Sequence, residues 1–361
     1  MKRPRHGGNL VWAAALAGCR ASELVDFSAS INPLGPPQSA IAAIQGSLAA
    51  LTAYPDPNYS ELCSTLSEWH ELPPDWVLPG NGAAELLTWA CRELSALDVT
   101  YLLTPAFGDY WRSLQTFGAK VHPVLLSEAI SPSGLRINKI IPQIGKAKKR
   151  GILLNNPHNP TGNLFPQERL KPYLEEFNLV VVDEAFMDFL PPGEEQSLIP
   201  LVKEYTNLVI LRSLTKFYSL PGLRLGYAIA HPERLRRWQK WRDPWPVNIL
   251  AAAAAVAVIQ DKTFQQQTWD WLPPTRQELF EGIKNIPGLQ PLEGAANFLL
   301  VETEKPSSQL QKQLLIKHKI LIRDCLSFPE LGDRFFRLAV RTTQDNQLLL
   351  QALSKCLLDT I

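Results

Sequence analysis

The segment Leu179-Val180-Val181-Val182-Asp183-Glu184 sets four consecutive apolar residues directly before two carboxylates. An apolar run that does not alternate with polar residues is typical of a strand covered by helices on both faces of a sheet. Comparable runs lie at residues 100–103, 151–154, 208–211 and 225–230, and the chain between them has helical segments. Strands that alternate with helices form a mostly parallel sheet. The sequence therefore predicts an α/β fold.

The length of 361 residues exceeds what one core usually supports, so we expect two domains. Residues 1–40 are interpreted as an N-terminal arm that contributes to the small domain and the active site, because their prolines disfavour regular structure. Residues 41–246 form the predicted large domain. Residues 247–361 form a smaller α+β domain, with strands expected at 297–302, 320–323 and 335–341 and a helix at 309–318.

The charge balance excludes several classes of partner. Lys and Arg number 36 against 35 Asp and Glu, and a net charge of +1 disfavours nucleic acid or an anionic membrane. The longest apolar stretch, 247–259, is shorter than the roughly 20 residues of a membrane span, and its alanine-rich composition predicts a buried or interfacial helix. Five cysteines without a C-x-x-C pair favour a reducing compartment and no metal site. With no signal-peptide pattern at the start, the expected location is the cytoplasm.

Polar residues follow three of the predicted strands, where an open α/β sheet binds its ligands. They lie at 155–162, at Asp183-Glu184 and at 212–216, a segment that ends in Lys216. Any one of them alone would be an ordinary turn or helix cap, but together they indicate a shared crevice. A lysine that follows a buried strand can have a lowered pKa and form a Schiff base.

Small residues in Gly80-Asn81-Gly82-Ala83-Ala84 open a predicted helix, whose N-terminus favours a phosphate group. The chain lacks G-x-x-x-x-G-K-[ST], which disfavours a P-loop enzyme. Ser213 and Lys216 also fit the S-x-x-K pattern of serine nucleophiles. We set this interpretation aside, because its partner tripeptides S-D-N and K-T-G are absent.

Four ordered motifs resemble those of the class I/II aminotransferase superfamily, which uses pyridoxal 5′-phosphate (PLP) on the aspartate aminotransferase-like fold, fold type I. They are Asn159-Pro160-Thr161-Gly162, Asp183-Glu184-Ala185, Ser213-Leu214-Thr215-Lys216 and residues 222–227. The resemblance extends over nearly the whole chain. It implies a large PLP-binding domain and a small domain.

The resemblance also implies a role for individual residues. Lys216 would hold PLP as a Schiff base, and Asp183 would keep the ring nitrogen protonated. Asn159 would bind the phenolic oxygen and Phe107 would stack on the ring. The phosphate group would be held by Gly82, Ala83, Ala84, Ser213 and Arg224. Tyr54 would reach the phosphate bound in a neighbouring subunit, so the resemblance implies a homodimer.

The last predicted strand carries two arginines. With a period of two, Arg337 and Arg341 project from the same face, and Arg323 ends a neighbouring strand. Converging guanidinium groups suit a small substrate with two anionic groups, such as a carboxylate and a phosphate. An exposed, charged strand face is the alternative that this segment leaves open.

Further motifs resemble the L-threonine-O-3-phosphate decarboxylases of the cobalamin pathway. They are His6-Gly7-Gly8-Asn9 and residues 26–35, 183–189 and 337–342. This resemblance implies decarboxylation to (R)-1-aminopropan-2-ol O-phosphate, and it assigns the substrate to His6, Asn32, Arg323, Arg337 and Arg341. A histidinol-phosphate or related aminotransferase is the alternative. Such enzymes usually carry Tyr where this chain has Phe186, and commonly Gly at the position of Arg341.

Overall fold

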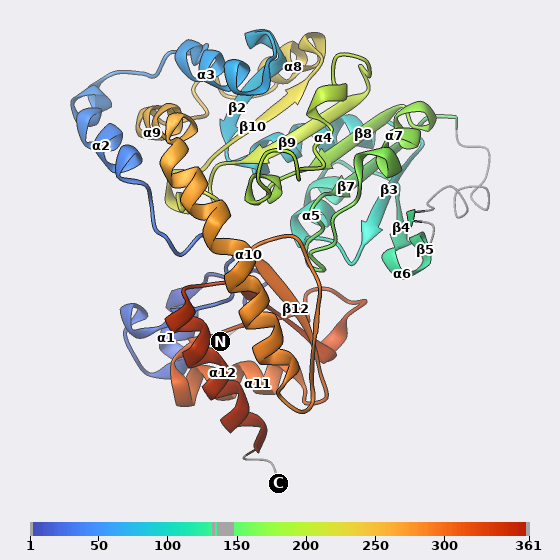
Figure 1. Ribbon diagram of the computed structural model, residues 1–361. Coiled ribbons are helices and arrows are strands. Elements are labelled where there is room, and N and C mark those ends of the chain that lie inside the picture. Colours follow the sequence, from blue (N-terminus) through green and yellow to red (C-terminus); the bar gives the residue numbers. More distant parts are fainter. Residues whose placement is uncertain (1–2, 132–133, 136–147, 359–361) are drawn as a thin grey trace.

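The computed structural model describes residues 3–131, 134–135 and 148–358. Its larger unit is built on a seven-stranded sheet (Figure 1). The order across the sheet is β2 (Val77–Asn81), β10 (Leu225–Ala230), β9 (Leu208–Ser213), β8 (Leu179–Asp183), β7 (Arg150–Asn155), β3 (Val99–Thr104) and β4 (Val121–Leu125). β10 runs antiparallel to both of its neighbours, and the other pairs are parallel. The α/β class and the mostly parallel sheet are thereby confirmed.

Helices cover both faces of this sheet (Figure 1). In β8, Val180 and Val182 belong to one buried apolar cluster, and Leu179 and Val181 belong to another. The strand alternates between two cores, which is why its sequence is apolar throughout. The helices of this unit are α2 (Gln38–Gly46), α3 (Ser60–His70), α4 (Ala83–Ser95), α5 (Gly108–Thr116), α7 (Gln167–Glu176), α8 (Pro232–Gln239) and α9 (Ile249–Gln260), with the short α6 (Leu126–Ala129) beside the two-stranded β5 (Ile130–Ser131) and β6 (Gly134–Leu135).

A smaller unit contains a four-stranded sheet. Its order is β11 (Leu289–Leu292), β12 (Phe298–Thr303), β15 (Phe335–Ala339) and β14 (Arg323–Asp324), and it packs with α11 (Ser307–His318) and α12 (Thr343–Leu358). The expected strand at 335–341 is thus shorter than predicted, because β15 ends at Ala339. The expected strand at 320–323 is divided into β13 (Ile320–Leu321) and β14.

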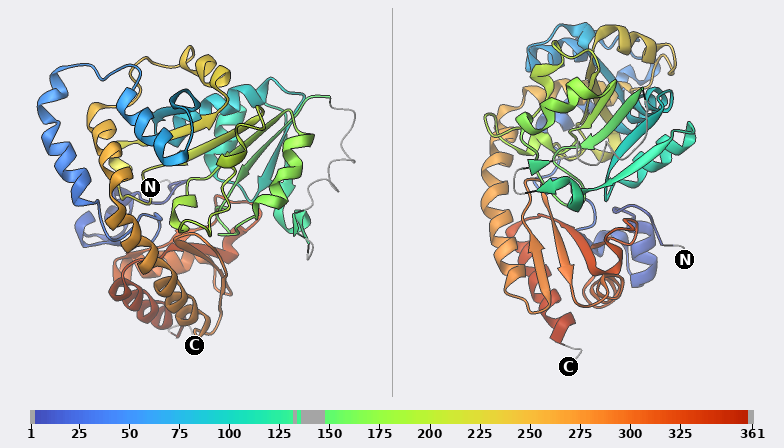
Figure 2. Two further views of the ribbon diagram at one scale, coloured as in Figure 1. Left: turned by 45° about the horizontal axis from the view of Figure 1, so that its top comes forward. Right: turned by 90° about the vertical axis from the view of Figure 1, so that its right-hand side faces the viewer.

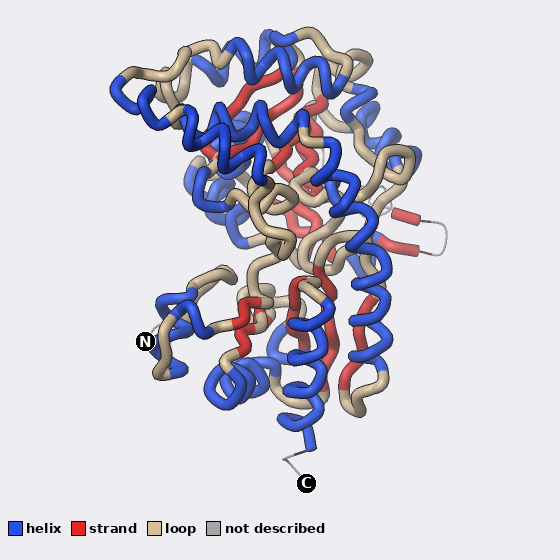
Figure 3. The backbone as a smooth tube through the Cα atoms, turned by 60° about the vertical axis from the view of Figure 1, so that its left-hand side comes forward, coloured by secondary structure: helices blue, strands red, loops and turns tan. Residues whose placement is uncertain are grey.

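Two segments join the units. α10 (Lys262–Lys284) runs from α9, which packs on α2 and α3, down along the smaller unit (Figure 3). It continues through Pro273 and Pro274, because the burial of residues such as Leu272 and Leu279 outweighs the low helix propensity of proline. None of the helices in the described part of the chain is both long enough and apolar enough to cross a membrane.

The N-terminal arm lies with the smaller unit, far from it in sequence (Figure 2). α1 (Leu10–Ala17) packs against α11, and β1 (Val25–Asp26) pairs in parallel with β13. The main chain of Phe27 continues this pairing with Leu321 and Ala339. The arm then crosses to the larger unit, where the Asn32 amide donates to the Lys216 carbonyl over 3.0 Å. It therefore connects both units at the edge where the parallel strands end.

Candidate active site

The strand register collects the polar strand ends at one edge of the large sheet. Asn155 and Asp183, the last residues of β7 and β8, are direct neighbours. β10 enters antiparallel between β2 and β9, so its first residues lie beside the ends of both strands. Leu225 pairs with Asn81, and Gly226 pairs with Ser213. This pairing explains why the segments around Gly82, Ser213 and Arg224 meet although they are far apart in sequence.

A cradle forms where these segments meet at the N-terminus of α4. Gly82 has φ +76°, and a Cβ atom there would lie 2.7 Å from Nη2 of Arg224. No side chain of a described residue caps the helix at this point, so its first amide groups are directed into the cradle. The Ser213 hydroxyl lies 2.8 Å from the Thr215 hydroxyl and 3.4 Å from Nζ of Lys216. Backbone donors, hydroxyl groups and a guanidinium group suit a phosphate.

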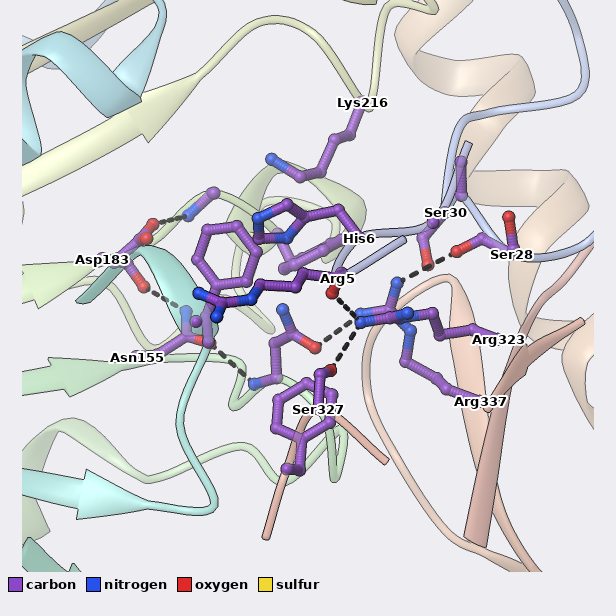
Figure 4. A pocket seen from close by; sticks show the side chains of 18 of the residues that line it. Arg5, His6, Ser28, Ser30, Asn155, Asp183, Lys216, Arg323, Ser327 and Arg337 are labelled. Atoms are coloured by element: carbon purple, nitrogen blue, oxygen red, sulfur yellow. Dashed lines mark hydrogen bonds between the residues drawn. The ribbon is translucent and has the colours of Figure 1, made fainter. Parts of the chain in front are cut away.

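Lys216 projects into the pocket beside this cradle (Figure 4). Its Nζ lies 5.0 Å from the ring centroid of Phe186. Burial lowers the pKa of the Lys216 amine, and the Asp183 carboxylate opposes this shift. A lowered pKa increases the fraction of neutral amine, which is the nucleophilic form.

Asp183 is buried opposite the lysine, and both of its carboxylate oxygens have a donor. The Tyr110 hydroxyl donates to Oδ2 over 2.7 Å, and the Ala185 amide donates to Oδ1 over 3.0 Å. Burial raises the pKa of Asp183, while Lys216 and the Tyr110 hydrogen bond oppose that rise. The carboxylate is therefore held in place by groups that favour its charged form.

Asn159 connects the large unit with the arginines of the small one. Its amide donates to Oδ1 of Asn155 over 2.6 Å, and Nδ2 of Asn155 donates to the Asp183 carbonyl over 2.7 Å. The Arg337 guanidinium in turn donates to Oδ1 of Asn159. A continuous set of hydrogen bonds thus runs from the end of β8 to β15.

Arg323 and Arg337 pair directly across β14 and β15 and face the same pocket. Arg337 also donates to the Ser28 carbonyl, and its guanidinium lies 4.8 Å from the ring of Phe298. Burial and the nearby Arg323 lower the pKa of Arg337 to about 10, so the side chain stays charged at neutral pH. Two adjacent positive charges beside an amine suit a ligand with two anionic groups.

The arm closes this pocket from the solvent side. Arg323 donates to the Arg5 carbonyl (Figure 4). The His6 ring lies 5.4 Å from the Phe107 ring, measured between ring centroids. Gly7 is required here, because a Cβ atom on it would lie 2.1 Å from the Ser28 carbonyl oxygen. Partial burial lowers the pKa of His6, so the free site holds a neutral imidazole at pH 7. The pocket has a volume of about 210 Å³.

A family model described as aminotransferase class I and II matches residues 22–353. The chain belongs to this family. A threonine-phosphate decarboxylase from Salmonella typhimurium is 37% identical over 98% of this chain and 96% of its own length. The structure of a histidinol-phosphate aminotransferase from Clostridium acetobutylicum has a TM-score of 0.85 at 29% identity and covers 94% of this chain and 100% of its own.

The fold itself is that of aspartate aminotransferase. A double mutant of the Thermus thermophilus enzyme has a TM-score of 0.81 at 20% identity, covering 98% of this chain and 97% of its own. The residues present fit PLP, the cofactor of this family. The cradle at Gly82, which a Cβ atom would fill, provides donors for the phosphate, and Lys216 and Asp183 face the same pocket.

Several predicted residues of this family member lie together. Lys216, Asp183, Asn159, Phe107, His6, Arg323 and Arg337 all line the pocket. Tyr54 lies elsewhere on the surface, 76% exposed and stacked on Trp245 with 4.4 Å between ring centroids. In a single chain, no described residue other than Trp245 makes a ring contact with it.

Arg341 and Asn32 were expected to bind substrate, and the structure gives both a different environment. Because β15 ends at Ala339, the two-residue period does not reach Arg341, which pairs with Asp345 over 3.0 Å and donates to the Asp26 carbonyl. Asn32 is buried and donates to the Phe217 carbonyl and the Thr268 hydroxyl. Within the described part of the chain, both side chains connect structural elements outside the pocket.

Sequence reasoning also missed residues that line the pocket: Arg5, Ser28, Ser30, Tyr110, Asn155 and Ser327. Asn155 begins the segment 155–162, and Ser28 and Ser30 stand in the motif 26–35, but only their contacts assign these residues a place in the pocket. Ser30 is buried, and its hydroxyl has no hydrogen-bond partner among the described residues. A buried hydroxyl without a partner in a pocket is available to a ligand.

Proposed function

We propose that this protein is a PLP-dependent decarboxylase that converts L-threonine O-3-phosphate into (R)-1-aminopropan-2-ol O-phosphate and CO2 in the cobalamin pathway. The observation that carries the proposal is the pair Arg323 and Arg337 in one pocket with Lys216. The substrate has a carboxylate and a phosphate, and two charged guanidinium groups match two anions. The similarity to the Salmonella typhimurium threonine-phosphate decarboxylase supports the same substrate.

When bound, PLP supplies an electron-accepting ring that stabilises the negative charge left on Cα as the carboxylate departs. Lys216 would hold the cofactor covalently, and the cradle at Gly82, Ala83, Ala84, Ser213 and Arg224 would hold its phosphate. Asp183 would pair with the ring nitrogen and Asn159 with the phenolic oxygen. The ring of Phe107 would cover one face.

The other residues of the chain bind and orient the substrate. Arg323 and Arg337 fix both anionic groups, and this grip decides which bond at Cα lies perpendicular to the cofactor ring. His6 and Ser30 add polar contacts at the arm, which also limits the entry of water. The reaction breaks the bond between Cα and the carboxylate carbon, releases CO2 and adds one proton to Cα. The ammonium form of Lys216 is the proposed proton donor, because its lowered pKa makes it a stronger acid than an ordinary lysine.

We further propose that the protein acts as a homodimer in the cytoplasm. Leu48, Leu51, Tyr54 and Trp245 are exposed large apolar side chains. Burial of such residues against a second copy would remove apolar surface from water. The same contact would bring Tyr54 to the neighbouring active site, as the family resemblance implies. Cys19, Cys63, Cys91 and Cys325 are free thiols, which is consistent with a reducing compartment.

The test is product analysis after the PLP-loaded protein is incubated with L-threonine O-3-phosphate and no 2-oxo acid. We expect CO2 and aminopropanol phosphate in equimolar amounts that greatly exceed the amount of enzyme. Turnover that requires 2-oxoglutarate and histidinol phosphate would instead establish an aminotransferase. That alternative has support from the Clostridium acetobutylicum structure. The Lys216→Ala protein is the control, and it should give no product.

A further inference from the structure

Tyr110 is a buried residue of α5 that contacts two groups of the proposed cofactor site at once. Its hydroxyl donates to Oδ2 of Asp183 over 2.7 Å. Its ring packs edge to face against Phe107, with centroids 5.6 Å apart and an angle of 84° between the planes. Phe107 and Asp183 are far apart in sequence, and the Tyr110 side chain contacts both.

The carboxylate of Asp183 needs this support because burial favours its neutral form. Burial raises the pKa of Asp183, and the groups that oppose the rise are the Lys216 ammonium, the Tyr110 hydroxyl and the Ala185 amide. Under the proposed function the Lys216 nitrogen is bonded to the cofactor, so it no longer faces Asp183 as a free ammonium group. The two hydrogen bonds then remain as the protein's own stabilisation of the charge.

The two donors differ in what they can fix. The Ala185 amide is two residues from Asp183 and bonds Oδ1 as part of the local turn. Tyr110 reaches Oδ2 from another element, so it determines how the carboxylate plane is turned. A tyrosine hydroxyl in this position has a pKa well above its usual value, so it stays protonated and acts as a donor.

We propose that Tyr110 is a positioning residue for Asp183, which it holds charged and oriented toward the ring nitrogen of bound PLP. This inference rests on the proposed function, because it requires that PLP bind in this pocket. It concerns a residue that acts through another one, and it predicts an effect that depends on the ring nitrogen.

The experiment compares two ligands in full-length protein freed of cofactor. One is PLP, and the other is 1-deaza-PLP, in which a carbon replaces the ring nitrogen. The dissociation constant of 1-deaza-PLP divided by that of PLP measures how much the ring nitrogen contributes to binding. Tyr110→Phe removes the hydroxyl and keeps the ring. We expect the ratio to fall about tenfold, the lower end of what a hydrogen bond to a charged group contributes, and kcat to fall with little change in KM.

Tyr101→Phe is the matched control. Tyr101 is also a buried tyrosine of the large unit, but its hydroxyl has no hydrogen-bond partner among the described residues. Its removal should leave the ratio unchanged. Asp183→Asn gives the lower limit of this ratio, because it removes the carboxylate that would pair with the ring nitrogen.

The outcomes separate the two levels of the argument. If the wild-type protein bound neither ligand, the proposed function itself would be contradicted. A Tyr110→Phe protein that binds both ligands more weakly, but keeps the wild-type ratio, would overturn the inference and leave Tyr110 as packing support for Phe107. A ratio that falls toward the Asp183→Asn limit supports it. Circular dichroism and thermal unfolding of each variant confirm that it is folded.

Discussion

Replacement of Arg323 tests the assignment of the substrate grip, because sequence and structure differ on which arginines form it. The sequence pattern paired Arg337 with Arg341, whereas the structure pairs Arg337 with Arg323 across β14 and β15. The Arg323 guanidinium uses Nη2 for the Arg5 carbonyl and the Ser327 hydroxyl. Among the described residues, Nε and Nη1 have no partner, so two donors and a full charge are available to the substrate.

The expected size of the effect follows from these contacts. Loss of one partner from a buried, hydrogen-bonded charge pair costs about 2–5 kcal/mol. For Arg323→Ala this corresponds to a fall in kcat/KM of roughly 30- to 5,000-fold. Arg323→Lys keeps the charge but loses the two-pronged geometry, so we expect a smaller fall, about 10- to 100-fold. Arg341→Ala removes a partly exposed pair with Asp345 that lies outside the pocket, so it should change kcat/KM little.

The assay measures CO2 release from L-threonine O-3-phosphate and from L-threonine by each variant. A substrate without phosphate has no use for the residue that binds the phosphate. The arginine whose loss abolishes the preference for the phosphorylated substrate is therefore the phosphate ligand. Equal losses in the Arg323→Ala and Arg341→Ala proteins would refute the reasoning from the pocket geometry. Full activity in Arg323→Ala would do the same.

Three further predictions concern the cofactor and the stability of the fold. Lys216→Arg should abolish both turnover and the absorbance of covalently bound PLP, measured by spectrophotometry after dialysis. Gly82→Ala should weaken PLP binding in a titration, because the new Cβ meets Arg224, whereas Gly46→Ala, where a Cβ meets nothing within 4 Å, should not. Burial lowers the pKa of His158 to about 3, so the unfolded chain takes up a proton below pH 6.5 that the folded chain does not. The free energy of unfolding, measured in urea, should therefore decrease by about 1.4 kcal/mol per pH unit on account of this residue as the pH falls from 6.5 toward 3. In the His158→Gln protein, this contribution to the pH dependence of the free energy of unfolding should be absent.

The central strands could be predicted from the sequence, but three edge strands could not. β3, β7, β8, β9 and β10 were predicted because each is a continuous apolar run. β2, β4 and β11 each contain a proline, which removes a backbone donor and lowers strand propensity. All three lie at the edge of their sheets, where one side of the strand needs no partner. The proline that prevented the prediction of each strand is therefore also typical of an edge strand.

The site residues also form two groups: those that a local sequence motif predicts and those that only contacts between distant segments bring to the pocket. Lys216 and Asp183 each follow an apolar strand directly, so the motif and the strand end coincide in the sequence. Tyr110 and Ser30 reach the pocket only through contacts between segments that lie far apart in the chain. Arg341 shows the limit of periodicity. Its projection depended on two further residues of strand after Ala339, but β15 ends at Ala339 and a short connection leads to α12, which begins at Thr343.

The positions of these residues separate the two tasks of the site. Residues at the strand ends of the large unit, Asp183 and Lys216 among them, face the proposed cofactor and are held by the sheet. The proposed substrate ligands Arg323, Arg337 and His6 come from the small unit and the arm, which are joined by β1 and β13. A movement of the small unit relative to the sheet would therefore change the grip on the anions without disturbing the cradle. Substitutions in the arm should alter the choice of substrate and leave the binding of PLP intact. Among the described residues, the arm contacts the proposed cofactor residues through the His6 ring, which lies against Phe107, and through the Asn32 amide, which donates to the Lys216 carbonyl.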